Sequence, residues 1–252
     1  MKKLLLGMVG LAAVGIAAPA SAADLAARPY TKAPPPMMAA IYDWSGFYIG
    51  LNGGGGWSHK CWDISNDAGV PVVPSSLEGC NNASGGIAGG QIGYRWQASS
   101  WVFGLEAQGD WAGLKGSNTS LFFGPAVTNQ SKINALGLFT GQVGYAWNNV
   151  LWYVKGGAAV ADDKYTGFVA GVAVDQAKET RWGGAIGTGI EFSFAQNWSA
   201  GVEYDHLFMG RHTNNFTDLA GVFSRTDSIK QDVDLVTARI NYRWGGPVVA
   251  KY

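Results

Sequence analysis

Residues 84–111 read SGGIAGGQIGYRWQASSWVFGLEAQGDW, and this stretch decides the fold. Large apolar side chains recur at every second position, with glycine or a strongly polar residue between them. Because successive side chains of a strand point to opposite faces, the stretch predicts a hairpin with one very apolar face and one charged face. The polar positions are Gln91, Arg95, Glu106, Gln108 and Asp110. The fold depends on which face lines the interior.

The same period of two recurs after Trp44 and predicts eight strands. They are residues 47–57, 86–96, 101–111, 135–147, 151–161, 182–194, 198–208 and 234–244. Long connections (58–85, 112–134, 162–181 and 209–233) alternate with short ones (97–100, 148–150 and 195–197). In an up-and-down sheet, this alternation places the long loops at one end and the short turns at the other, which is typical of outer-membrane barrels.

The two faces of the predicted strands differ in composition. One face carries the large apolar and aromatic side chains, and Asp234 is its only acidic or basic residue. The opposite face carries small residues, glutamines and nine charged residues: Arg95, Glu106, Asp110, Lys155, Glu191, Glu203, Asp205, Arg239 and Arg243. A lumen of eight strands has too little room for the apolar set. We therefore predict an all-β, eight-stranded antiparallel up-and-down transmembrane β-barrel with the charged face inside and the aromatic face in lipid.

Tryptophan gathers at the ends of the predicted strands. Its ring prefers the interface between membrane and water, so the pattern predicts an aromatic girdle at each end of the apolar band. A tryptophan-rich soluble core would not concentrate these residues at strand ends. The expected girdle residues are Trp57, Trp96, Trp101, Trp111, Trp147, Trp152, Trp182, Trp198 and Trp244.

The N-terminal residues have the composition of a secretory signal peptide. A basic start at Lys2 and Lys3 precedes an apolar run and a small-residue site, so we expect cleavage between Ala22 and Ala23. The chain then divides into a signal peptide (1–22), a Pro/Ala-rich periplasmic linker (23–44), an outer-membrane β-barrel (45–244) and a periplasmic tail (245–252).

Net charge and cysteine content limit the classes of function that the chain can have. Removing Lys2 and Lys3 leaves 16 basic against 18 acidic residues, a net charge of −2 that does not suit binding to nucleic acid. The two cysteines, Cys61 and Cys80, belong to an exported chain, where an oxidising compartment favours a disulfide. Such a bridge would pin the first long loop to the rim, and two free thiols are the alternative.

Several stretches together resemble a known family. They are YDWSGFYIGLNGGGGW at the first strand, GGIAGGQIGYRWQ at the second, WVFGLEAQGDW at the third, and later GQVGYAWNNVLWYVKGGAAV, GTGIEFSFAQNWSAGVEY and ARINYRW. The chain resembles the alphaproteobacterial outer-membrane immunogenic proteins, which are porin-family, opacity-protein-like barrels related to the OmpA membrane domain. This resemblance implies a Gram-negative outer-membrane location and recognition of Ile240, Tyr242 and Trp244 by the barrel-insertion machinery. Family members usually end at the aromatic residue that Trp244 matches, whereas this chain continues to Tyr252.

Charges of both signs occur on the face predicted to line the lumen. In a narrow lumen they favour ion pairs over a field that drives one ion through. The expected network comprises Arg95, Glu106, Lys155, Glu191, Glu203 and Arg239. In this hypothesis Glu106 and Glu203 share the two cations Arg239 and Lys155, and the lumen is closed except to water. Catalytic carboxylates are the alternative, but no pattern places a substrate inside.

A lipid-modifying enzyme would need a nucleophile, a histidine and an acid at the outer rim. The histidines are His59, His206 and His212. His206 neighbours Asp205, but adjacent strand residues point to opposite faces. The sequence has no metal-ligand spacing. We therefore expect no catalytic, cofactor-binding or metal-binding residue and no cofactor.

Three functions are compatible with these patterns. The first is a structural barrel that supports envelope integrity and displays long surface loops. The second is a small porin-like channel for ions or small solutes, which eight strands make physically poor. The third is the lipid-modifying enzyme. Expected partners are outer-membrane lipids and lipopolysaccharide, the barrel-insertion machinery, and host or envelope ligands at the loops.

Overall fold

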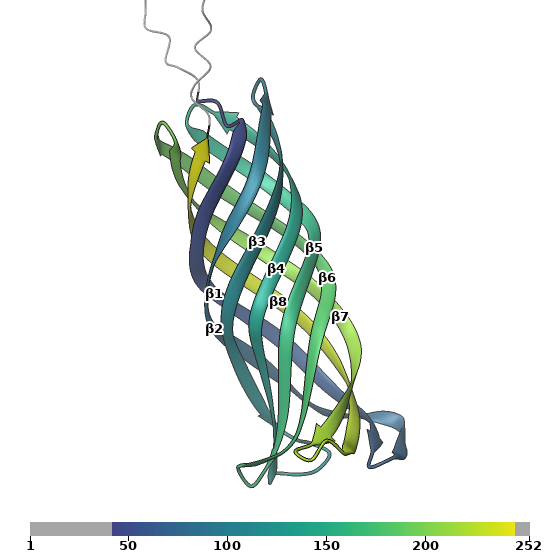
Figure 1. Ribbon diagram of the computed structural model, residues 1–252. Coiled ribbons are helices and arrows are strands. Elements are labelled where there is room, and N and C mark those ends of the chain that lie inside the picture. The colour runs from purple at the N-terminus through teal and green to yellow at the C-terminus, as the bar shows by residue number, and fades with distance from the viewer. Residues whose placement is uncertain (1–41, 245–252) are drawn as a thin grey trace, which may run out of the picture. The chain divides into compact units, whose positions relative to one another are not determined.

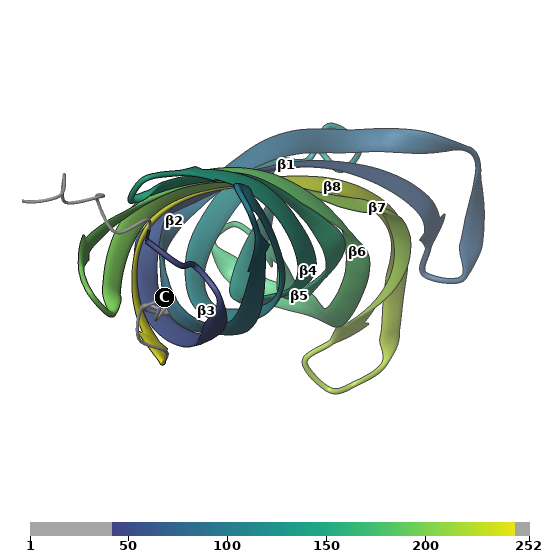
Figure 2. The same ribbon diagram turned by 90° about the horizontal axis from the view of Figure 1, so that it is seen from above.

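Eight antiparallel strands form a closed barrel in the computed structural model, which describes residues 42–244 (Figure 1). The strands are β1 (Gly46–Asp67), β2 (Val70–Ala98), β3 (Trp101–Thr119), β4 (Val127–Trp147), β5 (Val150–Val169), β6 (Val172–Ala195), β7 (Trp198–Asp218) and β8 (Phe223–Trp244). Each strand pairs with its neighbours in sequence, and β1 also pairs with β8, which closes the ring (Figure 2). The predicted fold class and strand number are confirmed.

Several predicted features lie outside the described residues. They are the signal peptide, its cleavage site at Ala22 and Ala23, the linker up to residue 41 and the tail at 245–252. Within residues 42–244, no helix is long and apolar enough to cross a membrane.

The segments predicted as long loops are mostly strand, so that part of the prediction was wrong. The β1–β2 ladder runs from Phe47↔Tyr94 to Asp67↔Val70, and the β5–β6 ladder ends at Val169↔Val172. Residues at positive φ close these two hairpins in tight turns at 68–69 and 170–171. We call residues 58–85, 112–134, 162–181 and 209–233 the hairpin extensions.

The extensions escaped prediction because the apolar signal on the outer face stops where lipid stops. Beyond Trp57, an outward side chain faces water and need not be apolar, so strict alternation of large apolar residues is lost. The backbone groups still need hydrogen-bond partners, and pairing with the neighbouring strand supplies them. Inward positions such as Lys60 and Trp62 stay buried throughout.

The structure places all nine girdle tryptophans on the outer face, with exposed fractions between 42% for Trp198 and 80% for Trp111. Two other tryptophans, Trp44 and Trp62, are buried inside the barrel. Trp44 had been assigned to the linker, but its side chain packs with Val102, Ala146, Leu151 and Tyr153. The packed chain therefore begins before β1.

Candidate functional site in the barrel lumen

Four charged side chains meet inside the barrel. Arg239 Nη2 lies 2.5 Å from Glu106 Oε2, and Arg239 Nη1 contacts Glu203 Oε2. Lys155 Nζ lies 2.6 Å from Glu203 Oε1 and 3.5 Å from Glu106 Oε1. All four side chains are at most 1% exposed. Each carboxylate is thus shared by the same two cations, and buried charges persist only with such partners.

A second ion pair lies in the lumen toward the short turns. Arg95 Nη2 lies 2.9 Å from Glu191 Oε2, and the Arg95 guanidinium lies 4.5 Å from the centre of the Tyr48 ring. Trp44 also lies against this guanidinium: the centre of its ring is 5.9 Å from Arg95 Cζ. The space among these side chains is too small to hold a water molecule. These side chains therefore pack closely against one another at this end of the barrel interior.

Two buried tyrosines belong to the network, and sequence reasoning missed both. Tyr48 Oη donates a hydrogen bond to Glu106 Oε2 at 2.7 Å, and Tyr153 Oη donates one to Glu203 Oε2 at 2.6 Å. Both tyrosines occupy the strand parity that points inward, between outward-facing apolar residues. The alternation that predicts Arg95 in the lumen also predicts both tyrosines there, but the expected network includes charged side chains alone.

Each tyrosine ring lies over a glycine of the next strand. Tyr48 is the register partner of Gly93, and Tyr153 is the register partner of Gly189. A Cβ atom at either glycine would lie 2.5 Å from Cζ of the facing tyrosine. The tyrosine, glycine and glutamate on β1, β2 and β3 therefore recur on β5, β6 and β7, four strands around the barrel.

Further polar side chains extend the network toward the hairpin extensions. Asp205 Oδ1 lies 3.2 Å from Lys155 Nζ, and Gln108 Nε2 donates a hydrogen bond to Asp110 Oδ2 at 2.8 Å. Lys155 thus faces three carboxylates. The sequence had placed Asp205 and Asp110 on the inner face without assigning them partners.

A layer of apolar side chains also fills the lumen. It was not foreseen, because glycine, alanine, serine and glutamine were expected to fill most inner positions. Its buried members are Ala83, Ile87, Leu114, Ile133, Leu136, Leu138, Ala159, Ala161, Ala185, Leu207, Met209, Val233 and Leu235. They come from β2 to β8, so the layer reaches across the barrel.

The hairpin extensions enclose a buried ion pair between Lys60 and Asp163. Lys60 Nζ lies 2.6 Å from Asp163 Oδ1, and both side chains are 0% exposed. Burial lowers the pKa of Lys60, and the charge and hydrogen bond of Asp163 oppose this effect. The pair joins β1 to β5 across the interior, as a structural contact between opposite walls.

Three carboxylates surround Arg225 in the same region. The distance from the nearest Arg225 nitrogen to a carboxylate oxygen is 2.6 Å for Glu78, 3.0 Å for Asp175 and 3.5 Å for Asp227. Burial raises the pKa of Asp227, Arg225 opposes the rise, and Glu78 and Asp175 add to it; the pKa that results is about 8. Asp227 therefore holds its proton at neutral pH.

The histidines at the rim pair with carboxylates of neighbouring strands. His206 Nδ1 lies 2.7 Å from Asp234 Oδ1, and His212 Nδ1 lies 2.8 Å from Glu179 Oε1. Asp205 points inward and does not contact His206. Within residues 42–244, no serine hydroxyl is hydrogen-bonded to His206 or His212.

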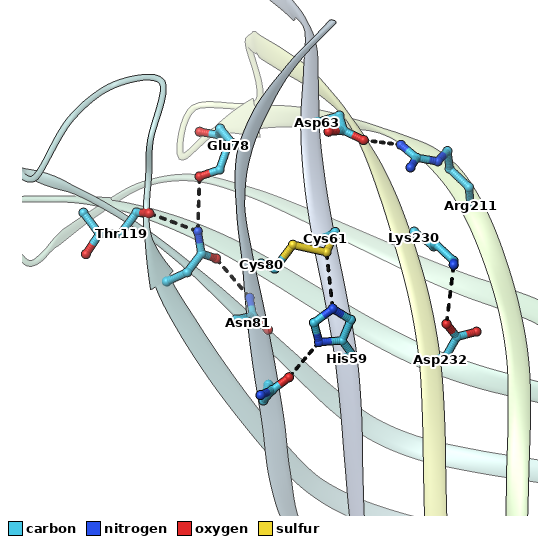
Figure 3. Close-up of a disulfide and its surroundings, with 12 residues drawn as sticks. His59, Cys61, Asp63, Glu78, Cys80, Asn81, Thr119, Arg211, Lys230 and Asp232 are labelled. Atoms are coloured by element: carbon cyan, nitrogen blue, oxygen red, sulfur yellow. Dashed lines mark hydrogen bonds and ion pairs between the residues drawn. A yellow bond between two sulfur atoms is a disulfide. The ribbon is translucent and has the colours of Figure 1, made fainter.

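Cys61 and Cys80 form a disulfide between β1 and β2, at a directly paired position of the ladder (Figure 3). A nitrogen of His59 and the two sulfur atoms all lie within 4.8 Å of one another. Zinc needs thiolate ligands, and these sulfur atoms are bonded to each other. In this form, the three residues are not a metal centre.

Residues 8–243 match the family described as "Outer membrane protein beta-barrel domain". The chain belongs to this family. The chain is 26% identical over 253 residues to the 31 kDa outer-membrane immunogenic proteins of Brucella melitensis and Brucella suis, over 97% of this chain and 100% of each relative. The resemblance found in the sequence is thereby confirmed.

Among solved structures, this outer-membrane barrel is similar to OprG from Pseudomonas aeruginosa. The TM-score is 0.51 at 11% identity, over 81% of this chain and 99% of OprG. At this identity the likeness supports the fold alone. The family places the protein in the Gram-negative outer membrane, where the aromatic outer face contacts lipid.

Proposed function

We propose that this outer-membrane barrel is a non-conducting structural protein that supports envelope integrity and displays its four hairpin extensions at the cell surface. The observation that carries this proposal is the filled lumen. Buried ion pairs, an apolar layer and a second set of buried charges follow one another along the barrel interior.

The central ion pairs oppose the passage of ions. A permeating ion would have to separate Arg239 from Glu106 and Glu203, and breaking a buried pair costs about 3–5 kcal/mol. Lys155 contacts the same carboxylates from the other side. No single side-chain rotation would therefore clear the lumen.

The apolar layer opposes passage for a different reason. Leu114, Leu138 and Leu235 are fully buried, so an ion at this level would lose its hydration water without gaining polar partners. Hydrophobic constrictions of this kind close channels by excluding water. The ionic and apolar layers together support a closed barrel over the porin-like alternative.

The enzyme alternative has less support. His206 and Asp234 supply a base and an acid on the outer face, but a nucleophile must lie within hydrogen-bond reach of the base. No serine hydroxyl in the described part of the chain is hydrogen-bonded to His206. Loss of a lipid-modifying activity on His206→Gln, with the fold intact, would be needed to favour this function.

Planar-bilayer recording tests the closed lumen. We expect the purified full-length protein to insert without a large steady conductance. A general porin in the same lipid provides the positive control. A triple variant, Leu114→Ser, Leu138→Ser and Leu235→Ser, removes three leucines of the apolar layer but keeps the ion pairs, so it is expected to remain closed as well. Large steady conductance of the wild-type protein would refute the proposal.

Envelope assays test the structural role separately. Deleting the gene is expected to increase leakage of periplasmic proteins and sensitivity to detergent, and expression of the full chain should restore both. An unchanged envelope in the deletion strain would count against structural support even if the barrel proves to be closed.

A further inference from the structure

The Cys61–Cys80 disulfide lies on the outer face of the β1–β2 hairpin extension, beyond the girdle residue Trp57 (Figure 3). Cys80 is exposed, whereas Cys61 is half-buried. Cys80 is the more exposed residue of the pair, so we take it as the one that an external thiol attacks.

His59 contacts the sulfur of the less exposed cysteine. Its Nε2 lies 3.4 Å from Cys61 Sγ, and its Nδ1 lies 2.7 Å from Asn82 Oδ1. An amide oxygen only accepts hydrogen bonds, so Nδ1 donates to Asn82. Nε2 of the neutral ring then carries a lone pair, so it can accept a proton and pass it on to the adjacent sulfur of Cys61.

Two basic and two acidic side chains lie around Cys61, and the one directly opposite it on β8 is basic. Lys230 of β8 is the register partner of Cys61, and its side chain is 58% exposed. Arg211 of β7 pairs with Asp63, and Asp232 lies 3.9 Å from Lys230. Nearby positive charge stabilises a thiolate. The surroundings thus favour Cys61 as the sulfur that leaves.

We propose that the Cys61–Cys80 disulfide is a surface site for thiol–disulfide exchange with an external thiol. The external thiolate attacks Cys80 Sγ, the bond between Cys80 and Cys61 breaks, and its electron pair goes to Cys61 Sγ. The proton that the external thiol lost is held on His59 Nε2 and passes from there to Cys61, which leaves His59 neutral again. The products are a mixed disulfide on Cys80 and a free thiol on Cys61.

The exchange needs no oxidant or reductant besides the incoming thiol, because one disulfide replaces another. Attack by the free Cys61 thiolate on Cys80 releases the external thiol and restores the bridge. The paired positions on β1 and β2 keep Cys61 close to Cys80 while the adduct exists. The site would therefore hold thiol-bearing molecules reversibly at the cell surface.

The test uses the full-length protein in detergent micelles and reduced glutathione as the probe. Timed samples are blocked with N-ethylmaleimide at low pH, and the modified peptides are identified by mass spectrometry. We expect glutathione on Cys80 and maleimide on Cys61. Adducts mainly on Cys61, equal labelling of both cysteines, or no adduct at all would overturn the proposal.

A variant series tests the part played by His59. His59→Gln can keep a hydrogen bond but cannot transfer a proton, so we expect adduct formation to slow by about tenfold. His212→Gln, which changes an exposed histidine paired with Glu179, is the matched control and should react at the wild-type rate. Equal rates for His59→Gln and wild type would contradict the proton transfer. Folded barrels migrate differently on a gel before and after heating, and this shift identifies misfolded variants. The labelling experiment on the wild-type protein tests the proposal even if a variant fails to fold.

Discussion

Two small residues determine how the lumen network is packed. Gly93 and Gly189 leave room for the rings of Tyr48 and Tyr153, whose hydroxyl groups orient the shared glutamates. The sequence contains 37 glycines, and most cannot be told apart by composition. These two matter because a neighbouring ring occupies the place of their missing side chain.

Replacing Gly93 with alanine should destabilise the barrel by about 1–3 kcal/mol, because the added methyl group meets the Tyr48 ring. The measurement is the urea midpoint of unfolding in lipid vesicles, followed by tryptophan fluorescence. Gly109→Ala is the matched control, because a Cβ at outward-facing Gly109 meets no atom within 4 Å. We expect this substitution to change the free energy of unfolding by no more than about 0.5 kcal/mol. Equal effects of the two substitutions would show that the close approach of Tyr48 is unimportant.

Asp227 should make stability depend on pH. The folded protein keeps this proton up to a pH of about 8, whereas the unfolded aspartate, with a pKa of 3.8, releases it earlier. The contribution is fully present below pH 3.8 and is lost as the pH rises toward 8. Asp227→Asn mimics the protonated form, so its apparent Tm should exceed that of wild type at pH 9 and lie close to it below pH 3.8.

Thermal unfolding at these two pH values checks the prediction. Asp232→Asn controls for removing a carboxylate from the outer face of the same strand, where Asp232 is 32% exposed. A stabilisation by Asp227→Asn that is equally large at both pH values would contradict a titrating Asp227.

At the scale of the elements, the hairpin extensions carry the barrel wall well beyond the apolar band. Their inner faces bury Lys60 with Asp163 and surround Arg225 with three carboxylates. Solvated loops would not hold such groups away from water. The extensions are therefore structured walls, and only their turns are free to vary.

A peptide tag should distinguish a wall from a loop. Inserted between Ala170 and Gly171, in the β5–β6 turn, it should leave the barrel folded and bind antibody on intact cells. Inserted between Asp163 and Lys164, it would shift the strand register and remove the pair with Lys60. We expect that second variant to be lost or unfolded. Equal tolerance at both sites would indicate that 162–181 is a loop.

At the scale of the whole molecule, closure of the ring places residues from distant strands in one network. Lys155 on β5 and Arg239 on β8 both contact Glu106 on β3 and Glu203 on β7. Alternation along the strands predicted that all four side chains line the lumen, and their opposite charges suggested this group. Alternation does not give their heights in the barrel, so the partners of Asp205 could not be foreseen from it.

The sequence by itself determined the fold class, the number of strands and which face meets lipid. These follow from the period of two and from the segregation of large apolar side chains, which are local properties of each strand. The tertiary structure decided the rest: the length of the extensions, the inner position of Trp44, the apolar layer and the partners of each charge. Those features depend on side chains brought together across the lumen. Their distances are set by closure, tilt and register, and the alternation along one strand records none of these.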